Sequence, residues 1–164
     1  MAILDLNDFK AESAIPGLLP AACGIGPANE AVRESVQAFI NKYEPMFLDR
    51  FYQGHEAERA DIEAYAALPE ESRKSRSKNR LLGLLKVPLS HYVAFYYFRH
   101  CTVRNTPIGG VVLQGENGSR NNTSTICVQL WNQMADLCIA IYADTFCIAH
   151  PDTEIFRYVN DFNL

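Results

Sequence analysis

The sequence predicts a mainly helical fold, a helical bundle with a long β-hairpin or extended arm inserted between the last two long helices. Three observations predict it. Apolar side chains recur at steps of three and four, as on one face of an α-helix. Proline and glycine separate these apolar segments. A stretch rich in glycine and asparagine, residues 106–123, divides the last two of them. Extended segments are expected at both ends of the chain.

Length and composition favour a single globular domain. The chain has 164 residues, of which 48% are hydrophobic and 21% charged, and a chain of this length buries about two-thirds of its unfolded surface. We divide it into an N-terminal arm at 1–26, a helical domain at 27–150 that includes the arm at 104–123, and a C-terminal tail at 151–164. The net charge of −4 argues against a protein that coats nucleic acid through its overall field.

Proline and glycine give the expected boundaries of the first helices. Residues 1–26 are poorly periodic, and their apolar side chains are expected to dock on another surface. Pro27 suits a helix start, and an amphipathic helix follows to Tyr43. Pro45 is expected to begin a separate short helix that Gly54 ends.

The middle of the chain is expected to hold two further helices and an aromatic one. A charged helix spans residues 56–68. Glu70 and Glu71 then occupy the first turn of a helix that ends before Pro88. Pro88 opens an aromatic helix that reaches Val103.

The arm between the last two long helices is expected to contact neighbouring copies. Asn117-Gly118 is a strong hairpin-turn signal. Because an isolated hairpin is marginal, such an arm would lie on, or add strands to, a neighbour. The candidate contact residues in it are Ile108, Val111, Val112, Leu113 and Asn117.

The last long helix is centred on Trp131, and Pro151 prevents its simple continuation. The C-terminal tail carries further candidate contact residues, namely Ile155, Phe156, Tyr158 and Phe162.

No residue pattern predicts catalysis, a cofactor or a metal ion. The four histidines lack the spacing of metal ligands, and the five cysteines form no C-x-x-C pair. Gly24-Ile-Gly26 lacks the third glycine of a dinucleotide-binding turn. An enzyme would need His91, His100 or a cysteine with a shifted pKa in a pocket. We therefore expect a protein that is not an enzyme, with reduced thiols.

A basic run, Arg73 to Arg80, has five cations in eight residues. At helical spacing Arg73, Arg76 and Arg80 share one edge. Two interpretations stay open: a solvated face, or a contact with phosphate or an acidic partner.

Membrane insertion is not expected. No apolar run approaches the ~20 residues that cross a bilayer, and the N-terminus lacks the basic start of a signal peptide. The sequence predicts folding in a cytoplasm without a membrane partner.

Four segments occur in an order that resembles a known family. They are Lys42–Leu48 (KYEPMFL), Val87–Phe98 (VPLSHYVAFYYF), Thr106–Val111 (TPIGGV) followed by Glu116-Asn117, and Trp131–Met134 (WNQM). Together they resemble small proteins of phages and prophages of gut Bacteroidetes that look like head–tail connector (adaptor) proteins. The resemblance spans Pro27 to Ile148 and rests on the shared order of several patterns.

This resemblance implies a structural virion protein of the phage neck, made in the host cytoplasm. It implies a homo-oligomeric, dodecameric ring on the portal protein, a docking surface for other neck or tail proteins, and transient, non-specific contact with packaged DNA. Two alternatives stay open. One is another neck or tail-completion protein, such as a stopper or tail terminator. The other is a cellular helical ligand-binding or regulatory protein with Tyr92, Tyr96 and Trp131 around a pocket.

Overall fold

The computed structural model contains four α-helices, which confirms the helical class that the sequence predicts. The structure describes residues 3–19, 29–101, 104–106, 109–111, 123–146 and 154–160. The helices are α1 (Glu30–Phe51), α2 (Glu56–Ala66), α3 (Arg76–Cys101) and α4 (Thr123–Phe146). Short 3₁₀ turns lie at Leu6–Asp8, Ala11–Ser13, Glu70–Ser72 and Glu154–Phe156.

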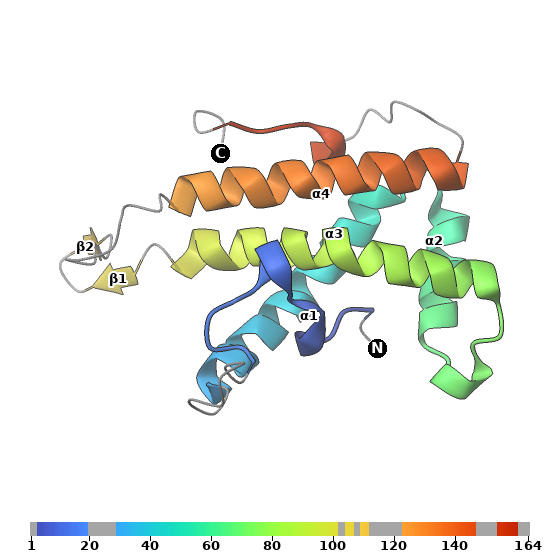
Figure 1. Cartoon of the computed structure of the whole chain (residues 1–164), viewed down its shortest axis with the longest axis horizontal. Helices are drawn as coiled ribbons and strands as arrows, with labels where there is room; N and C mark the ends of the chain where they lie inside the picture. The colour runs from blue at the N-terminus through green and yellow to red at the C-terminus, as the bar shows by residue number, and fades with distance from the viewer. Residues whose placement is uncertain are drawn as a thin grey trace.

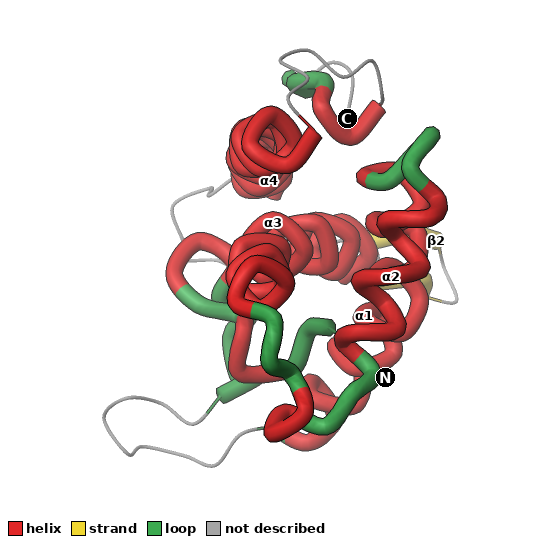
Figure 2. The backbone as a smooth tube through the Cα atoms, turned by 90° about the vertical axis from the view of Figure 1, so that its right-hand side faces the viewer, coloured by secondary structure: helices red, strands yellow, loops and turns green. Residues whose placement is uncertain are grey.

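An antiparallel pair of long helices, α3 and α4, forms the centre of the molecule (Figure 1). The helix α1 crosses α3 at a steep angle, and α2 lies at the end where α3 begins. Seen along α3, α4 lies on one side of it and α1 and α2 lie on others (Figure 2). The apolar faces of all four helices therefore meet around α3.

The helix α1 continues through Pro45, so the prediction of a separate helix beginning there is wrong. Asn29 caps the helix, because its side chain accepts a hydrogen bond from the Val32 N–H. A proline inside a helix removes one backbone hydrogen bond and costs about 3 kcal/mol. Burial of Tyr43, Phe47 and Phe51 along one continuous face offsets that cost. The end is as predicted, with Gly54 at φ +81° in the turn.

The helix α3 likewise runs through Pro88, so the two helices predicted on either side of this proline are one. Pro88 cannot donate to the carbonyl of Leu84, four residues earlier. Leu84 lies on the exposed side of α3, where water can satisfy that carbonyl. The helix also begins at Arg76 rather than Glu70, because Glu70–Ser72 forms a 3₁₀ turn. Ser75 caps α3 through its hydroxyl, which accepts from the Lys78 N–H.

The predicted long β-hairpin arm between α3 and α4 is wrong. The described part of that stretch holds only β1 (Arg104–Thr106) and β2 (Gly109–Val111), which pair antiparallel with Thr106 opposite Gly109. Three residues per strand make one local turn and not an arm, since strands of this length gain few ladder hydrogen bonds. The chain described here is otherwise helical or irregular.

Both terminal segments pack against the helices of their own chain. In residues 3–19, side chains of Ile3, Leu4, Phe9, Ile15 and Leu18 are buried in the core. At the other end, Ile155 and Phe156 are buried against α1 and α4. None of the helices within the described residues is long and apolar enough to cross a membrane.

Candidate interaction surface

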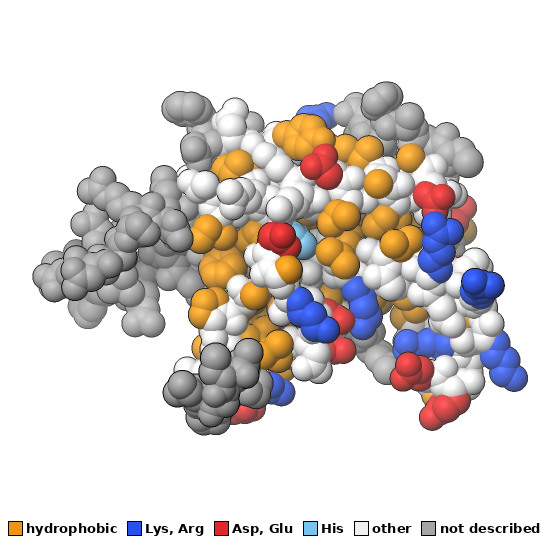
Figure 3. All heavy atoms as spheres, viewed as in Figure 1, with side chains coloured by type: hydrophobic (Ala, Val, Ile, Leu, Met, Phe, Trp, Pro, Cys, Tyr) orange, Lys and Arg blue, Asp and Glu red, His pale blue; other side chains and the backbone are white. Residues whose placement is uncertain are grey.

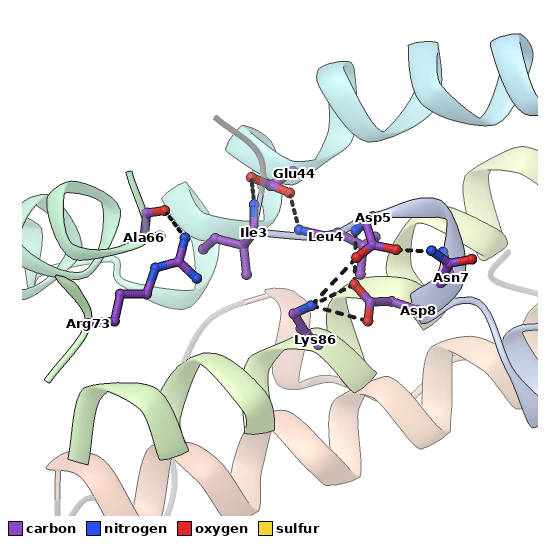
Figure 4. A network of polar contacts seen from close by, with 9 residues as sticks. All are labelled: Ile3, Leu4, Asp5, Asn7, Asp8, Glu44, Ala66, Arg73 and Lys86. Atoms are coloured by element: carbon purple, nitrogen blue, oxygen red, sulfur yellow. Dashed lines mark hydrogen bonds and ion pairs between the residues drawn. The ribbon is translucent and has the colours of Figure 1, made fainter. Parts of the chain in front are cut away.

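The connection between α2 and α3 forms an exposed but tightly bonded corner, which we call the α2–α3 corner (residues 67–75). The Arg73 guanidinium donates to two carbonyl oxygens at the end of α2, those of Ala66 (2.6 Å) and Leu68 (3.0 Å). Figure 4 shows the Arg73 side chain turned toward Ala66. These bonds satisfy carbonyls that a helix end leaves without partners.

A second set of bonds ties the corner to the start of α3. The Tyr65 hydroxyl accepts a hydrogen bond from the Ser75 N–H (2.8 Å) and donates to Asn79 Oδ1 (3.1 Å). Asn79 in turn donates from Nδ2 to the Arg73 carbonyl oxygen (2.8 Å). Lys78 pairs with Asp61 of α2 at 2.6 Å. The corner is therefore held in one shape although it projects into solvent.

The corner presents one apolar side chain followed by two carboxylates. Leu68 is 40% exposed, and Glu70 and Glu71 are exposed beside it. Within the described residues, neither carboxylate has a hydrogen bond or ion pair.

A second exposed surface runs along the outer side of α3, and we call it the α3 stripe. It consists of Arg76, Arg80, Gly83, Leu84 and Val87, which share one face at helical spacing. Leu84 is 39% exposed and Val87 is 47% exposed. The stripe is therefore basic toward the start of α3 and apolar toward its middle.

The apolar part of the stripe borders a shallow hollow at the end of α4. Arg80, Leu81 and Leu84 line it from α3, and Asp144 and Thr145 line it from α4. Arg80 pairs with Asp144 at 3.3 Å, and both side chains are well exposed. Figure 3 shows hydrophobic side chains along the line where α3 and α4 meet, and charges of both signs over the end that carries α2.

The three arginines predicted to share a helical edge have different positions. Arg76 and Arg80 lie on the α3 stripe, as the helical spacing indicates. Arg73 precedes the helix and is bound to carbonyl groups of the α2–α3 corner. Its role is to fix the shape of that corner.

The other sequence-predicted contact residues are not brought together with these arginines. Ile155 and Phe156 are buried in the core, and the Tyr158 hydroxyl donates to Asp136. Val111 is the last residue of β2. The remaining candidates, Ile108, Val112, Leu113, Asn117 and Phe162, lie outside the described residues.

A buried carboxylate elsewhere in the described chain binds to the backbone of the fold itself. Glu44 of α1 is buried, and its two carboxylate oxygens accept from the N–H groups of Ile3 (2.8 Å) and Leu4 (3.1 Å) (Figure 4). Burial raises the pKa of the Glu44 carboxyl, and the two N–H donors oppose that rise. Next to it, Lys86 pairs with Asp8 at 2.9 Å. These contacts attach the N-terminal segment to α1 and α3.

Of the groups that could serve chemistry, His91, Cys127 and Cys138 are enclosed in the described core, whereas His100 is exposed, with its ring Nδ1 3.1 Å from the Tyr96 carbonyl oxygen. The His91 ring Nδ1 lies 2.8 Å from the Val87 carbonyl oxygen, and His91 is buried. Burial raises the pKa of both the Cys127 and Cys138 thiols. The part of the chain that the structure describes contains no group of three or more His, Cys, Asp or Glu side chains arranged to hold a metal ion.

Comparisons with known proteins do not assign the chain to a family. No family model, no curated protein and no solved structure matches it. The α2–α3 corner and the α3 stripe therefore have to be interpreted from their own chemistry.

Proposed function

We propose that this chain is a structural protein of a tailed-phage neck, a head–tail connector that forms a ring on the portal protein and offers a docking surface to tail components. The observation that carries the proposal is the pair of exposed surfaces around the start of α3. A rigid corner presents Leu68, and a helix face presents Leu84 and Val87. Exposed apolar side chains on preformed surfaces are typical of proteins that assemble.

Three of the segments that resemble connector proteins meet in one core, and this supports treating their separate similarities as one resemblance. Tyr43 from the first segment stacks on Tyr96 from the second, with ring centroids 4.1 Å apart. Trp131 from the last segment contacts Phe95, with centroids 4.9 Å apart. Three segments far apart in sequence thus form a single packed centre.

The aromatic residues Tyr92 and Trp131 do not favour the alternative of a ligand-binding protein. Tyr92 and Trp131 are buried and their rings lie 6.0 Å apart. The Tyr92 hydroxyl accepts a hydrogen bond from Arg50 (2.9 Å). These side chains fill the core, and the space expected for a ligand between them is occupied by their own packing.

The proposal is tested by mixing the purified chain with the portal protein encoded in the same genome and imaging the particles by negative-stain electron microscopy. We expect added density as a ring on one end of the portal, with the chain co-eluting with portal in size-exclusion chromatography. Portal rings that stay bare in an excess of the chain would overturn the proposal. An unrelated helical protein of similar size is the control.

The within-class alternative, a stopper or tail terminator, predicts a different result in the same experiment. Such a protein would bind portal only after another neck protein has been added, or would bind tail tubes alone. Adding the remaining neck proteins one at a time therefore separates the connector from these two.

A further inference from the structure

We propose that the α2–α3 corner of one copy docks on the α3 stripe of a second copy, with Leu68 entering the hollow beside Leu84. The contact is a specific way for two copies of this chain to meet. It rests on the proposed function only for the closure of successive copies into a ring on the portal.

The two surfaces carry three of the four large hydrophobic side chains that are exposed in the described chain. The exposed large hydrophobic side chains there are Leu68, Leu84, Val87 and Tyr158. The last of these is held by Asp136 through its hydroxyl. The other three divide into one side chain at the corner and two on α3, of which Leu84 lines the hollow between α3 and α4. Leu81 and Leu84 give the hollow an apolar part that a leucine side chain can contact, and Ser77, Lys78, Arg80, Asp144 and Thr145 form its polar lining.

The charged parts of the two surfaces have opposite sign and lie beside the apolar parts. On the corner, Glu70 and Glu71 follow Leu68 by two and three residues. On the stripe, Arg80 precedes Leu84 by one helical turn, and Arg76 precedes Arg80 by another. When Leu68 of one copy meets Leu84 of the next, two carboxylates can face two guanidinium groups. Opposite charges around an apolar centre fix the register of an interface.

The charge on Arg80 is available for such a contact. Its partner within the chain is Asp144 at 3.3 Å, and both side chains are more than half exposed. Exposed ion pairs of this kind contribute little to stability. Arg76 has no ion pair within the described residues, so a second copy would supply its first.

Gly83 lies between the basic and apolar parts of the stripe and has no function that the fold itself explains. It is inside α3, it is exposed, and a Cβ built on it would meet nothing within 4 Å. Its φ is not in the left-handed region, where glycine is favoured. Glycine in a helix interior is unfavourable relative to alanine. A partner that approaches the backbone of α3 closely would account for the missing side chain.

The corner is preformed for docking. Arg73 holds the carbonyl of Leu68, and Tyr65 and Asn79 hold the residues that follow. An exposed turn that is already fixed loses little conformational freedom when it binds, which favours association. This advantage in binding explains why an exposed turn, which buries little surface of its own, has so many side-chain hydrogen bonds.

The corner and the stripe are different patches, and the proposed contact between them is head-to-tail. Each copy would offer its corner to one neighbour and its stripe to another. Contacts of this type generate closed rings or open filaments and not isolated dimers.

The main competing occupant of the stripe is nucleic-acid phosphate. Residues 56–80 contain six acidic and six basic side chains, so this end of the molecule has no excess positive charge. Binding to duplex DNA relies on such an excess. A protein surface that alternates charges and apolar groups fits a second copy better.

Cysteine cross-linking tests the contact directly. In a background with Cys23, Cys101 and Cys147 replaced by serine, Leu68→Cys and Leu84→Cys are made singly, with tags of different size, and oxidised separately and as a mixture. We expect the mixture to give the mixed dimer well above either single variant. Copies carrying both substitutions should form a ladder of higher oligomers. The cysteine-reduced background alone is the control, because the remaining Cys127 and Cys138 are buried.

Two results would overturn the contact. Homodimers of Leu68→Cys or of Leu84→Cys that outweigh the mixed dimer would show a different, symmetric contact. The oxidation is also carried out at concentrations that give ordered rings, or on portal particles. If mixed dimers are then no more abundant than in the background, these surfaces do not meet.

A charge exchange provides the independent test. Glu70→Arg with Glu71→Arg should weaken self-association by about tenfold, equivalent to about 1.4 kcal/mol, and so should Arg76→Glu with Arg80→Glu. Mixing the two double variants should restore association between them. Glu34→Arg, an exposed substitution on α1, is the matched control and should have no effect. The proposal would be overturned in favour of phosphate if the variant with Arg76→Glu and Arg80→Glu lost duplex-DNA binding while its self-association stayed unchanged.

Failure of the contact and failure of the proposed function give different results. Mixed Leu68–Leu84 cross-links with no binding to portal would retain the contact and reject the connector function. Rings on portal without these cross-links would retain the function and reject the contact.

Discussion

The Nε atom of Arg73 donates a hydrogen bond to the carbonyl oxygen of Leu68 over 3.0 Å, and this bond determines how Leu68 is presented to solvent. The same guanidinium reaches Ala66, so one side chain ends α2 and shapes the turn that follows. Its neighbour Lys74 is exposed, and the Lys74 side chain has no hydrogen bond or ion pair within the described residues. The two cations provide a matched comparison.

Arg73→Ala should lower the free energy of unfolding by about 1–2 kcal/mol, because two carbonyl groups lose a charged donor. Lys74→Ala should change it by less than about 0.5 kcal/mol. Urea denaturation followed by circular dichroism measures both, and amide hydrogen exchange should rise over residues 67–75 in the first variant only. Equal effects of the two substitutions would show that Arg73 does not hold the corner.

Gly83→Ala should raise the free energy of unfolding of the monomer by about 0.5–1 kcal/mol, because alanine is the better helix former and nothing within 4 Å of the added Cβ obstructs it. The same change should weaken self-association by placing a methyl group on the α3 stripe. Thermal unfolding of dilute protein and sedimentation velocity measure the two effects. A loss of monomer stability would contradict the expectation that alanine is tolerated at this position of α3.

The helices could be predicted from sequence, but their continuity at Pro45 and Pro88 could not. Local rules place a helix boundary at each proline. The structure overrides those rules because an unbroken helix buries more apolar surface. In α1 the buried residues are Tyr43, Phe47 and Phe51, and in α3 they include the aromatic residues after Pro88. That balance depends on tertiary packing, which periodicity alone does not contain.

The candidate surface could be found only in part. Arg76 and Arg80 follow from helical spacing. The exposure of Leu84 and Val87 was not predicted, although Leu82, Leu85 and Leu89 share the buried face at steps of three and four and leave these two residues outside it. The role of Arg73 had no sequence signal, since it depends on the path of a turn that returns to the end of α2.

Asn132 of α4 binds the backbone of the C-terminal segment at two points, and its removal should release that segment. Its side chain accepts from the Val159 N–H (2.8 Å) and donates to the Val159 carbonyl oxygen (3.0 Å). Asn132→Ala should cost about 1–2 kcal/mol and increase proteolysis between residues 154 and 160. Gln129→Ala on the same helix is the control. Unchanged protection of Val159 in hydrogen exchange would contradict this assignment.

Glu44→Ala should cost about 2 kcal/mol or more, because the buried N–H groups of Ile3 and Leu4 lose their acceptors. The N-terminal segment should then exchange its amide protons faster than α1 does. Glu34→Ala, an exposed change on the same helix, should leave both stability and exchange unaltered. If the two variants were equally stable, the N-terminal segment would be held by apolar packing alone.

The charge on Glu44 should also make stability depend on pH in a defined direction. Burial, the largest cause, raises its folded-state pKa above the ordinary value of 4.5. The folded chain therefore binds this proton more tightly than the unfolded chain does. As a result, the contribution of Glu44 to the free energy of unfolding falls as the pH rises from about 4.5 through the folded-state pKa, and is constant above it. Urea denaturation of the parent chain and of Glu44→Gln at several pH values between 4 and 7 isolates this contribution, because the other carboxylates are common to both. The stability of the parent relative to Glu44→Gln should decrease over that interval, and a relative stability that rises with pH would mean that the two N–H donors outweigh burial at this site.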